Sequence, residues 1–268
     1  MSTIRNLARL LGFGAALVAA YYTTAYARRT PPLFKPRVIA HRGGPKYGPE
    51  NTLAAFAHAF ARGVTMAECD VHLTRDGETI IIHDETLERT TNGSGWVMDL
   101  TLAELKQLDA GNGERLPTLA ELVELARPHG AELLIELKSP HLYPGIEFKV
   151  LTELEDLGYL DHCILQSFDW DCVRRLRQLK PSARLGALYD VGNLDVSWPP
   201  ADAEFVCPPA ENVLLNPNLV RTAHGEGRGV FVWFSRGEAP WLYRYLKTFG
   251  VDGLITDDPD AAREALSA

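Results

Sequence analysis

Nine short apolar runs, most of them separated by amphipathic stretches, follow one another along the chain and constrain its fold more than any other feature. Their length and β-branched content are typical of buried strands, and the longer stretches between them are typical of helices. This alternation predicts an α/β architecture. The predicted strands are RVIAHRG (37–43), MAECDVHL (66–73), TIIIHD (79–84), ELLIELK (132–138), CILQSF (163–168), RLGALYD (184–190), EFVCPP (204–209), GVFVWFS (229–235) and DGLITDD (252–258).

Three of the intervening stretches carry helix signals. The spacing of an amphipathic helix is followed by Leu53, Phe56, Ala57 and Phe60. Thr101 with Glu104, and Thr118 with Glu121, have the spacing of capping boxes, in which a threonine and a glutamate satisfy the first backbone N–H groups of a helix. Both pairs therefore predict helix starts.

The second and third predicted strands are joined only by TRDGE (74–78). A parallel crossover needs about a dozen residues or more, so these two strands must form an antiparallel hairpin. Without the return strand, eight candidates for parallel strands remain. Eight is the number that a (β/α)₈ TIM-type barrel requires, although an open sheet would also accommodate them.

The hairpin places polar side chains together. If residues 76–77 are the centre of a two-residue turn, Asp70 is predicted to face His83. The strand period of two puts Glu68 and His72 on the same face as Asp70. A solvated strand face is the alternative interpretation, but the apolar residues at the alternate positions favour a buried hairpin, in which charges need partners.

Polar side chains also stand where other predicted strands end. They are His41, Arg42, Glu136, Lys138, Gln166, Ser167 and Trp233. Active sites of β/α barrels are built at the C-terminal ends of the strands. Each of these residues has a structural alternative, such as a core histidine or a surface ion pair. Their joint occurrence is what indicates a site.

The charge balance and three of the carboxylates point to a metal ion. Six of the 27 cations and none of the 35 acids lie in residues 1–37, which leaves a net charge of −14 on residues 38–268. This balance argues against a nucleic-acid partner, and phosphate would require a metal ion or a local cluster of cations. Glu68, Asp70 and Glu136 have no cysteine or paired histidine beside them and suit one divalent cation, Mg²⁺ or Ca²⁺.

Two cations and two histidines complete the candidate chemistry. Arg42 and Lys138 are suited to binding phosphate oxygens. His41 and His83 titrate near neutral pH and are therefore candidates for the base and the acid. The residues alone do not assign which histidine has which role.

The cysteines predict no special chemistry. Cys69, Cys163, Cys172 and Cys207 lack C-x-x-C spacing and are too sparse for a disulfide framework. We therefore expect reduced, mostly buried thiols and no zinc site.

The N-terminal segment is suited to a membrane. Residues 10–27 contain no charge, have arginines on both sides and would span roughly 27 Å as a helix. This favours a single membrane anchor, with the flanking cations leaving its orientation open. A cleaved signal peptide ending at the small-x-small residues 25–27, followed by export, and a buried soluble helix are the alternatives. The predicted organisation is an anchor or signal segment with linker over 1–37 and one α/β body over 38–268.

The motifs taken together resemble the glycerophosphodiester phosphodiesterase family. They are AHRGGPKYGPENTLAAF (40–56), ECDVHLTRDGETIIIHDETLERTTNG (68–93), LLIELK (133–138), LQSF (165–168), VFVW (230–233) and GVDGLITDDPD (250–260). The resemblance extends over essentially all of 38–268 and rests on H-R-G, P-E-N-T, E-x-D, T-x-D-G and H-D occurring in that order.

The resemblance implies a fold and a role for each site residue. The fold would be a (β/α)₈ barrel with a hairpin-like insertion after the second strand. The implied roles are catalysis for His41 and His83, substrate binding for Arg42, Lys138, Trp233 and Glu50, and metal binding for Glu68, Asp70 and Glu136. One departure is that Trp233 is followed by Phe234-Ser235-Arg236 where the family often has Thr-Val-Asn, which affects the expected shape of the substrate pocket. His72 stays outside the catalytic set.

The expected activity is metal-dependent hydrolysis of glycerophosphodiesters to sn-glycerol 3-phosphate and an alcohol, with histidine acid–base catalysis. The nucleophile is either water or the neighbouring glycerol hydroxyl, and the sequence does not choose between them. A lysophospholipase D that uses the same site on membrane lysophospholipids is the alternative enzyme. A non-catalytic, membrane-tethered binding barrel is less favoured because the inferred site residues are all present.

Overall fold

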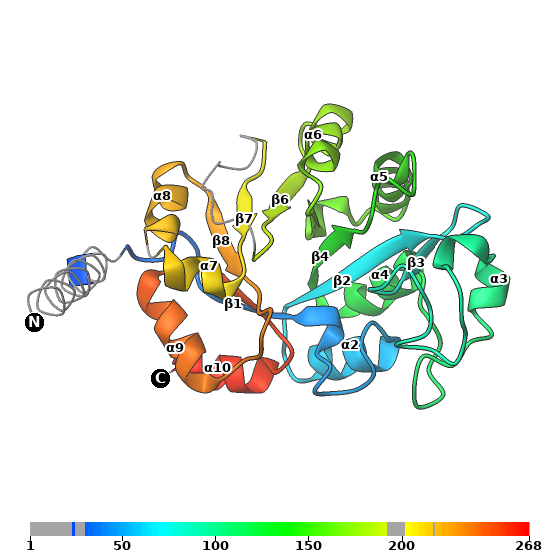
Figure 1. Ribbon diagram of the computed structural model, residues 1–268, viewed down its shortest axis with the longest axis horizontal. Helices are drawn as coiled ribbons and strands as arrows, with labels where there is room; N and C mark the ends of the chain where they lie inside the picture. Colours follow the sequence, from blue (N-terminus) through cyan, green and yellow to red (C-terminus); the bar gives the residue numbers. More distant parts are fainter. Residues whose placement is uncertain (1–22, 25–29, 192–201, 217, 268) are drawn as a thin grey trace, which may run out of the picture.

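Strand β1 (Arg37–Ala40) pairs in parallel with both β2 (Met66–Leu73) and β9 (Gly253–Thr256), and this double pairing closes the sheet into a barrel. The computed structural model describes residues 23–24, 30–191, 202–216 and 218–267. Within them, the barrel continues through β4 (Glu132–Leu137), β5 (Cys163–Ser167), β6 (Arg184–Leu188), β7 (Phe205–Cys207) and β8 (Gly229–Val232), all paired in parallel (Figure 1). The predicted parallel barrel is confirmed, and the open-sheet alternative is wrong.

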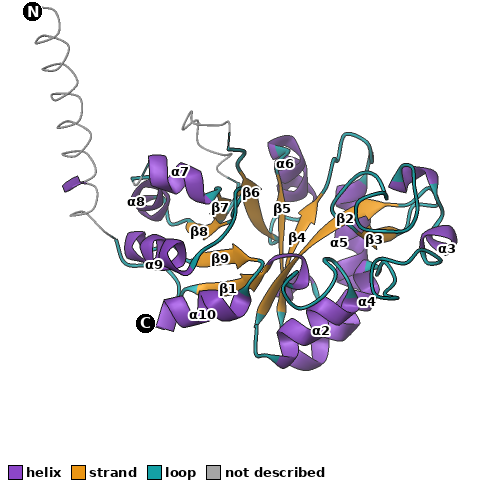
Figure 2. Ribbon diagram, turned by 60° about the horizontal axis from the view of Figure 1, so that its bottom comes forward, coloured by secondary structure: helices purple, strands orange, loops and turns teal. Residues whose placement is uncertain are grey.

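Helices cover the outside of this barrel (Figure 2). They are α2 (Leu53–Ala61), α4 (Leu119–Ala126), α5 (Ile146–Asp156), α6 (Trp170–Leu179), α7 (Ala210–Leu215), α8 (Leu219–Gly225), α9 (Pro240–Phe249) and α10 (Pro259–Ser267). A further helix, α3 (Leu102–Leu105), lies beyond the hairpin (Figure 2), and its Leu105 belongs to a separate buried cluster with Ile80. Both predicted capping boxes are confirmed. The Thr101 and Thr118 side chains accept hydrogen bonds from the backbone N–H groups of Glu104 and Glu121, respectively. In return, each glutamate carboxylate accepts from the backbone N–H of its threonine.

The barrel interior changes from apolar to polar along three neighbouring strands. Met66, Leu134 and Ile164 belong to one buried apolar cluster inside the barrel. Two residues further along the same strands, and therefore on the same face, stand Glu68, Glu136 and Gln166. The C-terminal end of the barrel thus carries the polar side chains, and the apolar cluster lies beneath them.

The return strand β3 (Thr79–Ile81) pairs antiparallel with β2, which confirms the hairpin, but the predicted register is wrong by one residue. Val71 pairs with Ile81, and the Ile82 N–H donates to the Asp70 carbonyl over 3.1 Å, so Asp70 does not face His83. The cause is the loop: the Thr74 N–H bonds the Glu78 carbonyl, which leaves three loop residues instead of two. Three-residue loops commonly combine a turn with a left-handed residue, here Gly77 at φ +79°.

The linker before β1 packs against the end of the barrel where the strands begin. The Phe34 N–H donates to Asp252 over 2.9 Å, and the Phe34 ring lies 5.9 Å from that of Phe205. Asp252 directly precedes β9, and Phe205 is the first residue of β7. The buried Asp252 carboxylate also accepts from the Val230 N–H over 2.8 Å, so one side chain ties the linker to two strands.

The predicted membrane segment, residues 10–27, lies outside the described residues apart from Thr23 and Thr24. None of the helices in the described part of the chain is long and apolar enough to cross a membrane. The four cysteines are free and buried, which confirms the expectation of buried thiols.

We predict that Gly77→Ala destabilises the protein by about 1 kcal/mol. No neighbouring atom lies within 4 Å of an added Cβ, so the cost comes from the left-handed backbone conformation itself, which alanine adopts unfavourably. Gly77→Asn is the matched control, since asparagine tolerates this conformation better. Equilibrium unfolding in urea measures both. Equal stability of the alanine variant and the wild type would contradict the hairpin geometry.

Candidate active site

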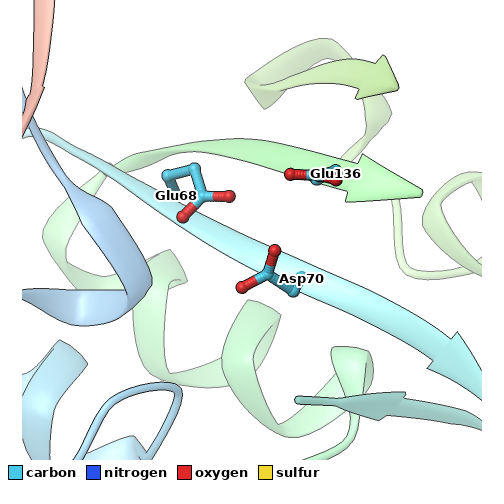
Figure 3. Close-up of side chains that lie close together, drawn as sticks. All are labelled: Glu68, Asp70 and Glu136. Carbon is cyan, nitrogen blue, oxygen red and sulfur yellow. The ribbon is translucent and has the colours of Figure 1, made fainter. Parts of the chain in front are cut away.

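Three carboxylates converge inside the C-terminal end of the barrel. Oxygen atoms of Glu68, Asp70 and Glu136, one from each side chain, all lie within 4.8 Å of one another, and the three residues are buried. Figure 3 shows Glu68 and Asp70 on β2 and Glu136 on the neighbouring β4. The parallel register pairs Asp70 with Glu136, and this pairing brings the two strands' acids together.

The electrostatics of this cluster fit a hard cation. Burial, with the charge of Asp70 beside it, raises the pKa of Glu68 to about 8, and burial also raises the pKa of Glu136. One Asp70 oxygen, Oδ1, is buried and has no hydrogen-bond partner. Three desolvated carboxylates with a free oxygen lone pair are the donor set that Mg²⁺ and Ca²⁺ prefer.

Lys138 stands among the acids. Its Nζ lies 2.9 Å from Glu136 Oε1, 3.7 Å from Asp70 Oδ1 and 3.2 Å from His83 Nε2. Burial alone would raise the pKa of Asp70, but Lys138, His83 and Arg42 outweigh it and lower this pKa to about 2. Of the three clustered carboxylates, Asp70 is therefore the one that stays ionised down to the lowest pH.

Arg42 lies on the 3₁₀ turn His41–Gly43, directly after β1, and has a left-handed backbone with φ +50°. Its N–H donates to Glu68 over 3.0 Å, and its carbonyl accepts from the Asn51 N–H over 2.8 Å. The guanidinium contacts Glu50 at 2.9 Å and Asp70 at 3.5 Å. These contacts hold a conformation that is unfavourable for arginine, as is common at functional sites.

Glu50 lies between two arginines. Arg89 donates two hydrogen bonds of 2.8 Å to its two oxygens, and Arg42 donates a third. Burial would raise the pKa of Glu50, but the two arginines outweigh burial and lower it. Glu50 thus remains ionised and fixes the direction of the Arg42 side chain.

His41 is oriented by an aspartate from the far end of the sequence. Its Nδ1 lies 2.7 Å from Asp257 Oδ1, which leaves Nε2 as the ring nitrogen available for proton transfer. Burial lowers the pKa of His41, but the Asp257 hydrogen bond and the charge of Glu68 outweigh it, so the net pKa lies above the usual value for histidine.

His83 has a similar arrangement and the opposite pKa shift. Its Nδ1 lies 2.6 Å from Asp84 Oδ1, and its Nε2 points to Lys138. Burial lowers the pKa of His83, and the nearby Lys138 and Arg42 charges reinforce the decrease against Asp70 and Asp84. The two shifts run in opposite directions, so His41 holds its proton to a higher pH than His83 does.

The site residues surround a cavity of about 320 Å³. Its lining includes His41, Arg42, Glu68, His83, Glu136 and Trp233. Glu50, Asp70 and Lys138 are not part of this lining but contact residues that are. Phe168 forms an edge contact with Trp233 at 5.8 Å on the rim, and Phe234 both lines the cavity and packs on Tyr243 at 5.4 Å.

Four residues that the sequence reasoning missed support this arrangement: Asn51, Asp84, Arg89 and Asp257. Asn51 donates to Asp70 over 2.9 Å from a left-handed backbone with φ +57°. A signal existed for three of them, because Asn51 lies in P-E-N-T, Asp84 in H-D and Asp257 in LITDDPD. Arg89 lies in the same quoted stretch, 68–93, as Asp84, but its pairing with Glu50 depends on the fold of the loop after β3.

Comparison with known proteins agrees with this geometry. Residues 41–261 match the model of the glycerophosphoryl diester phosphodiesterase family. A glycerophosphodiester phosphodiesterase of Caldanaerobacter subterraneus is 41% identical over 238 residues, which cover 84% of this chain and 96% of that protein.

Two solved structures have a similar fold over most of this chain. The crystal structure of a glycerophosphodiester phosphodiesterase from Agrobacterium tumefaciens has a TM-score of 0.73 and 28% identity, and covers 85% of this chain and 99% of that one. An Oleispira antarctica phosphodiesterase, solved with the product sn-glycerol-3-phosphate, has a TM-score of 0.76 and 29% identity, and covers 91% of this chain and 99% of that one. The chain therefore belongs to the glycerophosphoryl diester phosphodiesterase family.

Proposed function

We propose that the chain hydrolyses glycerophosphodiesters to sn-glycerol 3-phosphate and an alcohol, with one divalent cation bound by Glu68, Asp70 and Glu136. The observation that carries this proposal is the convergence of these buried carboxylates beside a cavity that two histidines also line. Family membership and the product bound to the Oleispira relative support it. When bound, the cation would offset the charge that develops on the phosphoryl oxygens.

Arg42 is the protein group best placed to bind the phosphoryl group. It lines the cavity, and Glu50 fixes its direction, so its remaining donors can meet a non-bridging oxygen without first being ordered. Lys138 acts from behind the lining, where its charge keeps Asp70 ionised and its Nζ contacts His83. Trp233 would pack on the substrate at the rim of the cavity.

The opposite pKa shifts support different roles for the two histidines. His41, whose pKa is raised, holds its proton to the higher pH and would donate it to the departing alkoxide. His83, whose pKa is lowered, loses its proton at a lower pH than His41 and would accept the proton of the nucleophile, water or the glycerol hydroxyl. Asp257 and Asp84 orient the two rings for these transfers.

We further propose that residues 10–27 anchor the protein in a membrane, because this uncharged stretch is long enough to span the hydrocarbon core. A lysophospholipid is the second candidate substrate. The partly exposed Phe168 beside Trp233 offers an apolar rim for an acyl chain. Small glycerophosphodiesters remain the first candidate.

Metal dependence tests the proposed function. Excess chelator should abolish hydrolysis of glycerophosphocholine, and Mg²⁺ or Ca²⁺ should restore it. Glu136→Gln should lower kcat/KM at least about 100-fold, because it replaces a negatively charged carboxylate ligand by a neutral amide oxygen. Glu132→Gln is the matched control, since it lies on the same strand at the opposite end of the barrel, where Glu132 pairs with Arg184.

Full turnover in excess chelator would contradict the metal site. The same assay with lysophosphatidylcholine separates the two substrates. A kcat/KM more than about tenfold higher for the lysolipid, equivalent to about 1.4 kcal/mol, would make the lysophospholipase activity the primary one.

The pH profile tests the histidine assignment. The active form needs neutral His83 and protonated His41, so kcat/KM should rise as His83 loses its proton below the usual histidine pKa and fall as His41 loses its proton above it. Asp257→Asn removes the carboxylate that raises the pKa of His41, so the alkaline limb should move to lower pH. Asp258→Asn, next in the chain, should leave this limb in place, and an unmoved limb in the Asp257 variant would refute the assignment.

Fractionation tests the membrane anchor. The untagged protein should sediment with membranes and remain there after a high-salt wash, because an apolar span is not released by screening charges. A variant lacking residues 1–29 should appear in the soluble fraction. A wild-type protein that is soluble and begins at Arg28 would establish signal cleavage instead.

A further inference from the structure

His72 is a fully buried histidine on β2 that the proposed reaction does not use. Its Nε2 lies 3.1 Å from the backbone carbonyl oxygen of His83, and its Nδ1 lies 3.0 Å from the hydroxyl of Tyr143. A carbonyl oxygen only accepts hydrogen bonds, so Nε2 carries the proton and donates it. Nδ1 then accepts from the Tyr143 hydroxyl, and both ring nitrogens are satisfied.

This contact occurs where the regular pairing of the hairpin has ended. β3 ends at Ile81, and the last backbone bond from this segment to β2 is the one from Ile82 to Asp70. His83 follows directly, and its carbonyl is held by the His72 side chain instead of a backbone N–H. The His72 bond thus extends the attachment of the return segment by one residue, to the residue that carries the imidazole.

The orientation of His72 is itself fixed from the opposite side. Tyr143, which is buried, comes from the segment between β4 and α5 and contacts the His72 ring edge-on at 5.4 Å in addition to its hydrogen bond. The chain of contacts therefore runs from Tyr143 through His72 to the His83 backbone. It ends at the His83 ring, whose Nε2 lies 3.2 Å from Lys138 Nζ.

We propose that His72 is a positioning residue, which fixes the backbone of His83 so that its imidazole reaches the substrate in the orientation that proton transfer needs. The inference rests on the proposed acid–base role of His83. A displacement of about 1 Å in a catalytic group can lower a rate 100-fold, so one hydrogen bond to the backbone of such a group has a disproportionate effect.

Two substitutions at His72 test the hydrogen bond itself. His72→Leu keeps an apolar side chain of comparable bulk but removes the donor, and kcat for glycerophosphocholine should fall at least about tenfold while KM changes less than about twofold. His72→Gln places an amide N–H where Nε2 stands and should recover most of kcat. A purely structural role predicts instead that kcat follows thermal stability in both variants.

Two controls make the result decisive. Tyr159→Phe removes a comparable buried hydrogen bond, to the Ala131 carbonyl at the opposite end of the barrel, and should lower the thermal midpoint without changing kcat. His83→Ala tests the premise: if it retains near-normal kcat, the proposed role of His83 fails, whatever His72 does.

With His83→Ala inactive, two results overturn the inference: a folded His72→Leu with wild-type kcat, or a folded His72→Gln as impaired as His72→Leu. Should the leucine variant not fold, Tyr143→Phe decides, because it removes only the hydroxyl that orients His72. A lower kcat at unchanged KM supports the positioning role. A kcat equal to that of the wild type overturns it.

Discussion

The parallel register between β2 and β4 is the constraint on which the rest of the site depends. It sets Asp70 beside Glu136 inside the barrel, with Glu68 two residues before Asp70 on the same face. Three buried carboxylates repel one another and are poorly solvated, so they require positive charge close by. Lys138 and Arg42 supply part of it, and a divalent cation would supply the rest.

The surrounding network follows from that requirement. Arg42 reaches the acids from the turn after β1, where its left-handed backbone is held by the Glu68 carboxylate and the Asn51 N–H. Glu50 in turn keeps the guanidinium directed at the cavity. Ion pairs of this kind are weak evidence for stability because desolvation opposes them, and their value here is a preorganised charge distribution.

Much of the fold, and less of the site, could be predicted from the sequence. Strand periodicity locates the strands because burial imposes it locally, and the short connection 74–78 identifies the hairpin. The register was missed because residues 75–77 form a three-residue loop, closed by the hydrogen bond from Thr74 to Glu78 and ending at the left-handed Gly77. The sequence alone does not distinguish such a loop from a two-residue one. The partnership of His41 with Asp257 joins residues 216 positions apart, and only the closure of the barrel creates it.

The linker before β1 has a consequence for access to the site. It is fastened by Asp252 to the end of the barrel where the strands begin, whereas the carboxylates and the histidines stand where the strands end. With residues 10–27 in a bilayer, as proposed, the barrel would be held by its base and the mouth of the cavity would open away from the lipid. A water-borne diester could then diffuse in freely, while a lysolipid would have to leave the bilayer to be cleaved.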